Sequence, residues 1–146
     1  MHGEHEPCRE PPDLSVAAEA AVESWRAAMA WQHAVDQALS TLDLTHTRFL
    51  VLLGAALATA EMGDAVTQQC IADAAGLDKV TTSRLVNRLG AEGLLDKNIH
   101  GLDDRKLRIY VTRTGRLRLE RACALVDEAA ASFGPVRYPE ARPRPG

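Results

Sequence analysis

Basic side chains gather in one stretch of this chain, between Lys79 and Arg121. That stretch holds eleven Lys or Arg against five Asp or Glu, a local excess of six positive charges. The remaining residues have fifteen acidic and six basic side chains, so the chain as a whole has a formal net charge of -3. A basic segment on an acidic body is typical of a local surface for a polyanion. Charge alone fits a solvated helix face equally well, so the spacing of these residues has to separate the two interpretations.

The elements that position these charges are expected to be mainly helical. The 146 residues fit one domain, with an ordinary globular composition of 46% hydrophobic and 25% charged residues. Ala is frequent among the apolar residues, which favours helices packed on small side chains. No apolar run approaches the roughly 20 residues that span a bilayer. The odd number of cysteines favours free thiols over a disulfide framework, and we expect a cytoplasmic protein.

Hydrophobic periodicity predicts a series of helices interrupted by one hairpin. The expected helices are residues 14–42, 46–60, 68–75, 79–93 and 113–133. Two extended runs, 94–99 and 107–111, are expected to pair around a charged tip. Residues 1–12 are rich in Pro and Glu, residues 135–146 are rich in Pro, and both are expected to be disordered tails. The domain itself should therefore span residues 13–134.

Two of the short helices, separated by "GLD", have the form of a helix-turn-helix, in which the second helix is offered to DNA. The side chains expected to pack inward from that second helix are Val80, Leu85, Val86 and Leu89. The side chains left for solvent or DNA are Lys79, Thr81, Thr82, Arg84, Asn87 and Arg88. A recognition helix contacts base edges mainly from its N-terminal residues. We therefore expect Thr81, Thr82 and Arg84 to contact bases, and Lys79 to bind phosphate.

The hairpin that follows converts this motif into a winged helix. Arg105 at its tip suits the narrow and strongly negative minor groove of DNA, and Lys106 adds a second positive charge. Asp103, two residues before Arg105, can accept from the guanidinium and hold it in position. The predicted fold class is mainly α with a small β-wing: a winged helix-turn-helix with long N- and C-terminal helices.

From about Leu44 to Gly115 the chain resembles the MarR family of winged-helix transcriptional regulators. The resembling stretches are "LTHTRFLVLL", "TQQCIADAAGLDKVTTSRLVNRLGAEGLLDK" and "DDRKLRIYVTRTG". The last carries the family's Asp-x-Arg wing pattern at Asp103 and Arg105, followed by a Thr-x-x-Gly turn at Thr112 and Gly115. Val111 stands where the family more usually has Leu, a minor departure.

The resemblance implies a homodimer in which the first and last helices of two subunits interleave. Residues 13–42 and 113–134 would be the dimerisation helices, and residues 44–112 the DNA-binding lobe. Such a dimer would place two recognition helices about one turn of DNA apart, on a pseudo-palindromic operator. The family usually represses nearby genes until a small molecule or an oxidant loosens DNA binding. The sequence names neither the operator nor the effector.

In relatives, phenolic or other aromatic acids bind between the dimerisation helices and the DNA-binding lobe. An aromatic wall with a few polar groups is what such a cleft needs. The candidate lining residues are Trp25, Met29, Trp31, His33, His46 and Arg48. The alternative interpretation, which we favour for Trp25 and Trp31, is a place in the dimer core.

Cysteine chemistry gives a second class of regulator with the same fold. Cys8 and Cys70 are the redox candidates, whereas Cys123 is expected to be buried in the last helix. The tail places His2, His5 and Cys8 at even spacing, but this spacing matches no known metal site and a solvated tail is expected. We assign no metal and no cofactor.

Two other classes of protein fit less well. An enzyme is not expected, because the sequence has no Gly-rich phosphate loop, no HExxH and no G-x-S-x-G. A winged helix that binds only protein would have an acidic or neutral recognition face, whereas this one is basic. The favoured interpretation is a DNA-binding transcriptional regulator.

Overall fold

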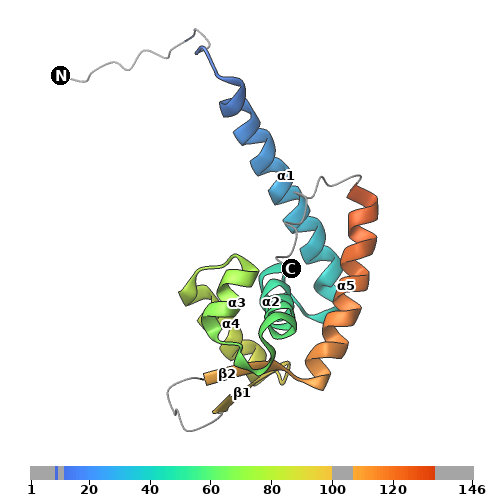
Figure 1. Cartoon of the computed structure of the whole chain (residues 1–146). Helices are drawn as coiled ribbons and strands as arrows, with labels where there is room; N and C mark the ends of the chain where they lie inside the picture. Colours follow the sequence, from blue (N-terminus) through green and yellow to red (C-terminus); the bar gives the residue numbers. More distant parts are fainter. Residues whose placement is uncertain (1–8, 10–11, 100–106, 134–146) are drawn as a thin grey trace, which may run out of the picture.

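The structure is a computed structural model that describes Arg9, residues 12–99 and residues 107–133 (Figure 1). Its long helices are α1 (Val16–Leu39), α2 (His46–Met62) and α5 (Arg113–Phe133). Between α2 and α5 lie the shorter helices α3 (Gln68–Ala75) and α4 (Lys79–Ala91), followed by strands β1 (Leu95–Ile99) and β2 (Leu107–Val111). Two single 3-10 turns, η1 (Ser40–Leu42) and η2 (Gly63–Ala65), follow α1 and α2. This confirms the predicted winged-helix architecture.

Side-chain caps determine where four of the helices begin. Ser15, Thr45, Thr67 and Asp78 each accept a hydrogen bond from the backbone N–H three residues later, at 3.0–3.3 Å. Such caps satisfy N–H groups that have no partner within the helix. The predicted bounds of α3 and α5 match the structure. The predicted helix 14–42 is shorter, because its last turn tightens into η1, and α4 ends two residues early, before Gly93 in a left-handed conformation (φ 74°).

Helix α1 projects well beyond the rest of the fold, and α5 lies beside its C-terminal part (Figure 1). Every residue from Val16 to Ala30 is exposed, whereas Val35 and Leu39 are buried. Trp31 and Phe133 join the two helices by an edge-to-face contact with ring centroids 5.6 Å apart. The half of α1 that carries these exposed residues therefore has no partner among the described residues.

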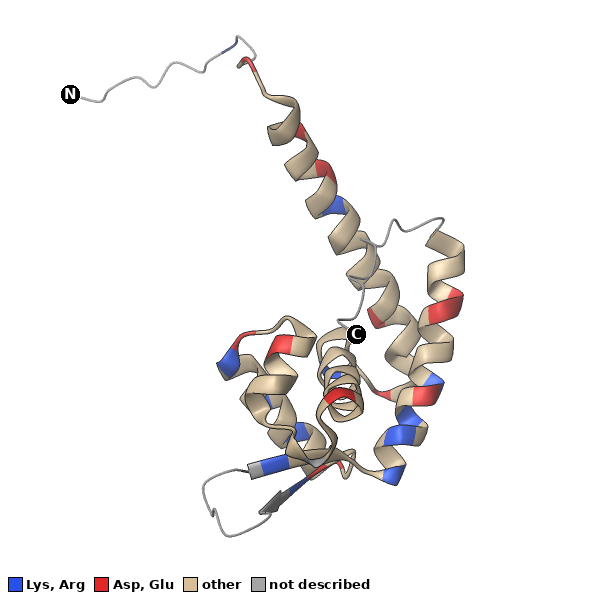
Figure 2. Cartoon of the chain, in the orientation of Figure 1, with Lys and Arg blue, Asp and Glu red and all other residues tan. Residues whose placement is uncertain are grey.

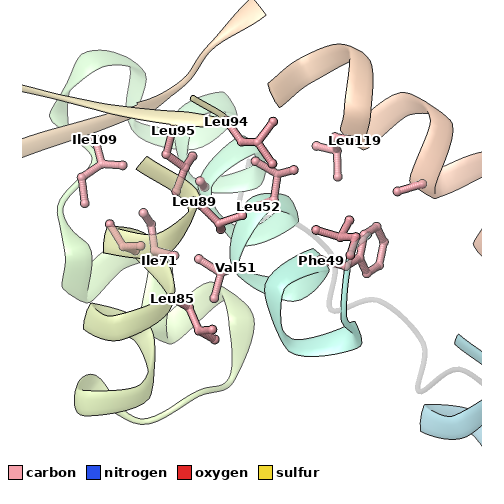
Figure 3. Close-up of a cluster of buried hydrophobic side chains, with 14 of the residues drawn as sticks. Phe49, Val51, Leu52, Ile71, Leu85, Leu89, Leu94, Leu95, Ile109 and Leu119 are labelled. Carbon is pink, nitrogen blue, oxygen red and sulfur yellow. The ribbon is translucent and has the colours of Figure 1, made fainter. Parts of the chain in front are cut away.

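The hydrophobic core lies between α2, the helix-turn-helix and the base of the wing (Figure 3). Its fully buried large side chains include Leu39, Leu52, Ile71, Leu89, Leu94 and Leu95. Leu57 of α2 does not belong to this core, because its side chain is 50% exposed. The face of α2 that packs inward is centred instead on Val51, Ala55 and Ala58.

The wing is an antiparallel pair in which Leu95 is opposite Val111 and Ile99 is opposite Leu107. It is fastened to the lobe by the backbone of Ile109, which donates to the Val66 carbonyl at 3.0 Å. The tip, residues 100–106, lies outside the described residues. Within the described ranges, no helix is both long and apolar enough to cross a membrane.

Candidate nucleic-acid interface

Helix α4 presents a basic outer face beside the wing (Figure 2). Lys79, Arg84, Asn87 and Arg88 are exposed there, as the sequence predicted, and Thr81 is half-buried. A hollow of about 670 Å³ runs along this face. It is lined by Gln68, Lys79, Val80, Ser83, Arg84 and Asn87. Sequence reasoning missed Gln68 and Ser83. Ser83 belongs to α4 itself, whereas the place of Gln68 beside Arg84 depends on how α3 packs across α4.

The register of α4 corrects two assignments. Thr82, predicted to face DNA, is fully buried, and its hydroxyl donates to the Asp78 carbonyl at 2.8 Å. Val80, predicted to pack inward, is 81% exposed. The cap at Asp78 sets the rotation of the helix so that Thr82, Val86 and Leu89 lie on one inner face, following the i, i+4, i+7 pattern. Thr82 is therefore buried away from the exposed face of α4, and Val80 lies on that face.

The Asp78 carboxylate is itself fully engaged at the start of the recognition helix. It accepts from the Thr81 backbone N–H at 3.0 Å and from the Thr81 hydroxyl at 2.7 Å. These hydrogen bonds from Thr81 lower the pKa of Asp78. The Thr81 hydroxyl is thus committed to the cap.

Of the wing residues predicted to bind DNA, Asp103, Arg105 and Lys106 lie outside the described residues. The base of the wing, however, contacts the recognition helix directly. The Nζ of Lys97 in β1 donates to Oδ1 of Asn87 in α4. Asp96, which precedes Lys97 in β1, is opposite Tyr110 of β2, and the Tyr110 hydroxyl donates to it at 2.9 Å.

Arg48, predicted to line an effector pocket, is buried instead at the foot of the recognition helix. One guanidinium nitrogen donates to the Asp43 carbonyl at 2.9 Å and another forms an ion pair with Glu92. Glu92 also lies 3.5 Å from Nε of Arg88. The assignment of Arg48 to the pocket was wrong, because its side chain turns into the core, where it ties the loop before α2 to the end of α4.

The other predicted effector residues do not converge on one cavity within a single chain. Trp25 is 65% exposed, Met29 and His33 are also exposed on α1, and Trp31 packs on Phe133. His46 lines a cavity of about 410 Å³. The other residues around this cavity are Gln32, Asp36, Ser40, Asp43, Leu44, Thr45 and Thr47.

A larger cavity, of about 680 Å³, lies between α2, β2 and α5. Its walls are mostly apolar, and two arginines, Arg113 and Arg116, open onto it together with Tyr110. Sequence reasoning missed this cavity because its lining residues come from three elements that are distant in the sequence. In the described part of the chain, no cluster of three or more His, Cys, Asp or Glu could hold a metal ion. The tail residues His2, His5 and Cys8 fall outside that part.

His46 should make stability depend on pH. Burial lowers its pKa, while the nearby Asp36 acts in the opposite direction. Below a pH of about 6.5 an unfolded histidine binds a proton that folded His46 does not yet bind. The unfolded state therefore binds more protons, and stability falls as pH decreases from about 6.5 towards the lower pKa of the folded state. Urea unfolding at pH 7.5 and 5.5 measures how much unfolding free energy is lost between the two pH values. This loss should be smaller for His46→Gln than for the wild type, and an equal loss would contradict the role of His46 in the pH dependence.

The two described cysteines differ in their surroundings. Cys70 lies in the first turn of α3, 3.1 Å from the Thr67 hydroxyl and 3.4 Å from the sulfur of Met62. The hydrogen bond with Thr67 lowers the pKa of Cys70, whereas burial raises the pKa of Cys123. Both are half-buried, so the prediction that Cys123 is buried in the last helix was wrong. Cys8 lies outside the described residues.

This contrast predicts selective alkylation. In a Cys8→Ser background at pH 7.5, iodoacetamide should modify Cys70 at least about tenfold faster than Cys123, because the thiolate is the reactive form. Mass spectrometry of tryptic peptides over time measures both rates in one sample. Equal rates, or faster modification of Cys123, would remove Cys70 from consideration as a reactive thiol.

The sequence and the fold of this chain are similar to those of known proteins. Residues 42–106 match the model of the MarR family. A MarR-family transcriptional regulator from Rhodococcus sp. RHA1 is similar to this chain, with a TM-score of 0.70 and 26% identity over 88% of this chain and 86% of that one. Over residues 42–106 and in its fold, this chain is similar to the MarR family.

Two further proteins are similar to this chain over most of its length. YdcH of Bacillus subtilis strain 168, an HTH-type transcriptional regulator, is 28% identical over 109 residues, which are 75% of this chain and 74% of YdcH. CouR from Rhodococcus jostii RHA1, whose crystal structure is bound to p-coumaroyl-CoA, has a TM-score of 0.70 and 26% identity. That match covers 84% of this chain and 82% of CouR. The chain is thus similar to MarR-family transcriptional regulators and has their DNA-binding fold.

Proposed function

We propose that this MarR-like protein is a sequence-specific repressor whose homodimer binds a pseudo-palindromic operator and is released by a small-molecule effector. The observation that carries the DNA-binding part is the exposed basic face of α4, where Lys79 and Arg84 line an open hollow beside the wing. A basic helix face next to a two-stranded wing fits the major groove and the flanking backbone of DNA. In the cell we place this activity in the cytoplasm, on the nucleoid.

The exposed half of α1 supports a homodimer. On α1, Val22 is 53% exposed, Trp25 65% and Met29 39%, and Leu117 and Phe133 of α5 are also exposed. Apolar side chains in one row on an unpacked helix favour burial against a second copy of the same helices. In this arrangement residues 13–42 and 113–134 form the dimerisation region, and residues 44–112 the DNA-binding lobe. Trp25 is then part of the interface rather than of an effector cavity within one subunit.

The effector part of the proposal rests on the cavity between α2, β2 and α5. Its apolar walls and Arg113 suit a ligand with an aromatic or acyl body and an anionic group, whereas Arg116 is paired there with Glu120. It adjoins both α5 and the wing strand β2, so an occupant could alter the angle between the dimerisation helices and the lobe. A cysteine-based switch at Cys70 is the second candidate, favoured by the lowered pKa of that thiol.

The first test is fluorescence anisotropy of the purified protein with the DNA upstream of its own gene and with a scrambled duplex, across a salt series. We expect tighter binding to the native duplex and an affinity that falls steeply as salt rises, because phosphate contacts release counterions. Phenolic acids and peroxide are then added to the complex. If a well-folded dimer binds neither duplex, the proposal fails and a protein-binding role for the winged helix takes its place.

Arg84→Ala should weaken binding to the native duplex by about tenfold or more, because a lost base contact costs about 1–3 kcal/mol. If Arg84 reads a base, the preference over the scrambled duplex should shrink as well. The matched control is Arg116→Ala on α5, where the arginine is paired with Glu120 at 3.1 Å. An unchanged affinity for Arg84→Ala would contradict its role. Arg105→Ala in the same assay tests the wing tip and should leave the dimer intact.

A further inference from the structure

Lys97 lies where the wing meets the recognition helix, and it was not among the DNA-binding residues that the sequence suggested. The register of the wing places it opposite Ile109, which is buried, and Leu95 two residues earlier is buried as well. Side chains two apart in a strand share a face, so Lys97 projects from the face of β1 that packs towards α4. Unlike Leu95 and Ile109, Lys97 is exposed, at the outer edge of that face.

From this position the ammonium group reaches the recognition helix. Its Nζ donates to Oδ1 of Asn87, which is exposed and belongs to the lining of the hollow along α4. Since the amide oxygen of Asn87 is turned towards Lys97, its NH₂ group remains as a pair of outward donors. An ammonium can donate three hydrogen bonds, so Lys97 keeps donors beyond the one that Asn87 uses. The two side chains together present a small group of N–H donors at the seam between helix and wing.

The carboxylates near this seam are each held by a partner. Asp96 accepts from the Tyr110 hydroxyl at 2.9 Å and from the Lys97 backbone N–H at 2.8 Å. Glu92 is paired with Arg48 and Arg88, as described above. Asp78, at the other end of the helix, is bound to Thr81. None of these three carboxylates is hydrogen-bonded to the ammonium of Lys97 among the described residues, so none of them forms an ion pair that would compete with an external anion.

We infer that Lys97 and Asn87 form a joint site for one backbone phosphate of DNA, at the point where the backbone passes from the groove that α4 enters to the groove that the wing enters. This inference rests on the proposed DNA-binding function. Lys97 contributes the charge, and Asn87 contributes donors and fixes the lysine against the helix. A phosphate held there sets the register of the protein on the duplex without reading a base.

The test measures affinity for the native and the scrambled duplex across a salt series with Lys97→Met. A lost phosphate contact should weaken binding to both duplexes by a similar factor, about tenfold. The slope of log affinity against log salt should also fall by roughly two for a dimer, one for each lost contact. Lys97→Arg should restore most of the affinity. Arg9→Met removes an exposed positive charge that lies outside both the DNA-binding lobe and the dimerisation helices, and should leave both quantities near the wild type.

A double-mutant cycle tests whether the site is joint. Lys97→Met and Asn87→Ala should cost less together than the sum of their separate effects, because either change disrupts the same phosphate contact. Thermal unfolding shows whether Lys97 acts only as a brace: a purely structural role would lower the Tm and leave the salt slope unchanged, and this result would overturn the inference. If the wild type binds DNA and Lys97→Met has the same salt slope as the wild type, the inference is overturned but the proposed function stands. If the wild type does not bind DNA, the proposed function is overturned.

Discussion

Gly115→Ala is expected to destabilise the protein by about 3 kcal/mol, at the upper end of what overpacking costs. A Cβ added at Gly115 would overlap the carbonyl oxygen of Leu94 and lie 2.9 Å from its carbonyl carbon. Both are backbone atoms, and they cannot move aside as the end of a long side chain can. The clash therefore has to be relieved by separating the start of α5 from the base of the wing.

That junction is held by several hydrogen bonds that the displacement would strain. The Thr112 backbone N–H donates to the Leu94 carbonyl at 3.1 Å, and its hydroxyl donates to the Gly93 carbonyl at 2.6 Å. The Gly115 N–H in turn donates to the Thr112 hydroxyl at 3.0 Å. The Thr-x-x-Gly turn thus joins the wing to the first turn of α5, and the added methyl group acts on all of these contacts at once.

The matched control is Gly90→Ala in α4. A Cβ there would meet only the Leu95 carbonyl oxygen, at 3.8 Å, which is ordinary van der Waals contact. Because Ala is a better helix former than Gly by about 1 kcal/mol, this change should be neutral or stabilising. Urea unfolding of both variants at one fixed protein concentration makes the comparison, since dimerisation makes stability depend on concentration. If Gly115→Ala unfolds at the same urea concentration as the wild type, the close packing at Leu94 is not a constraint in solution.

The helices and the wing could be predicted from the sequence because their signals are local. The capping residues Thr67 and Asp78 precede apolar runs at helical spacing, and Gly76 and Gly93 follow them, so the position of the helix-turn-helix is encoded within about thirty residues. The rotation of α4 about its own axis was harder to predict. Its apolar residues fit two rotations that differ at Val80 and Thr82, and only the cap at Asp78 and the packing against α3 select one.

The parts of the site that sequence reasoning missed depend on contacts between distant residues. Lys97 looked like one more charge on a hairpin until the register of β1 placed it against Asn87. Arg48 was assigned to a ligand cleft because a cleft with an aromatic wall needs a few polar groups. It is buried because Glu92, 44 residues later, supplies a countercharge at the end of α4. Such pairs leave no periodic signal in a single sequence.

The Arg48–Glu92 ion pair leads to the second large expected effect. Arg48 has only 7% of its side chain exposed, whereas Glu92 has 33%, so removal of either partner leaves the other in a different environment. Glu92→Ala leaves a guanidinium in the core without its countercharge, which should cost about 3 kcal/mol. Arg48→Met should cost less, because the methionine suits the apolar surroundings, and Glu92 remains accessible to water and keeps Arg88 as a partner.

The double variant Arg48→Met/Glu92→Ala separates an interaction from two independent effects. With the buried charge gone, the second change removes only a half-exposed carboxylate. The double variant should therefore lose about as much stability as Arg48→Met alone, and much less than the sum of the two single losses. Urea unfolding gives all three free energies, and a coupling of at least about 1 kcal/mol is expected for groups in direct contact. Additive losses would mean that the buried arginine is stabilised by the Asp43 carbonyl and not by Glu92. The end of the recognition helix would then be anchored by its apolar residues, Leu85 and Leu89, rather than by charge.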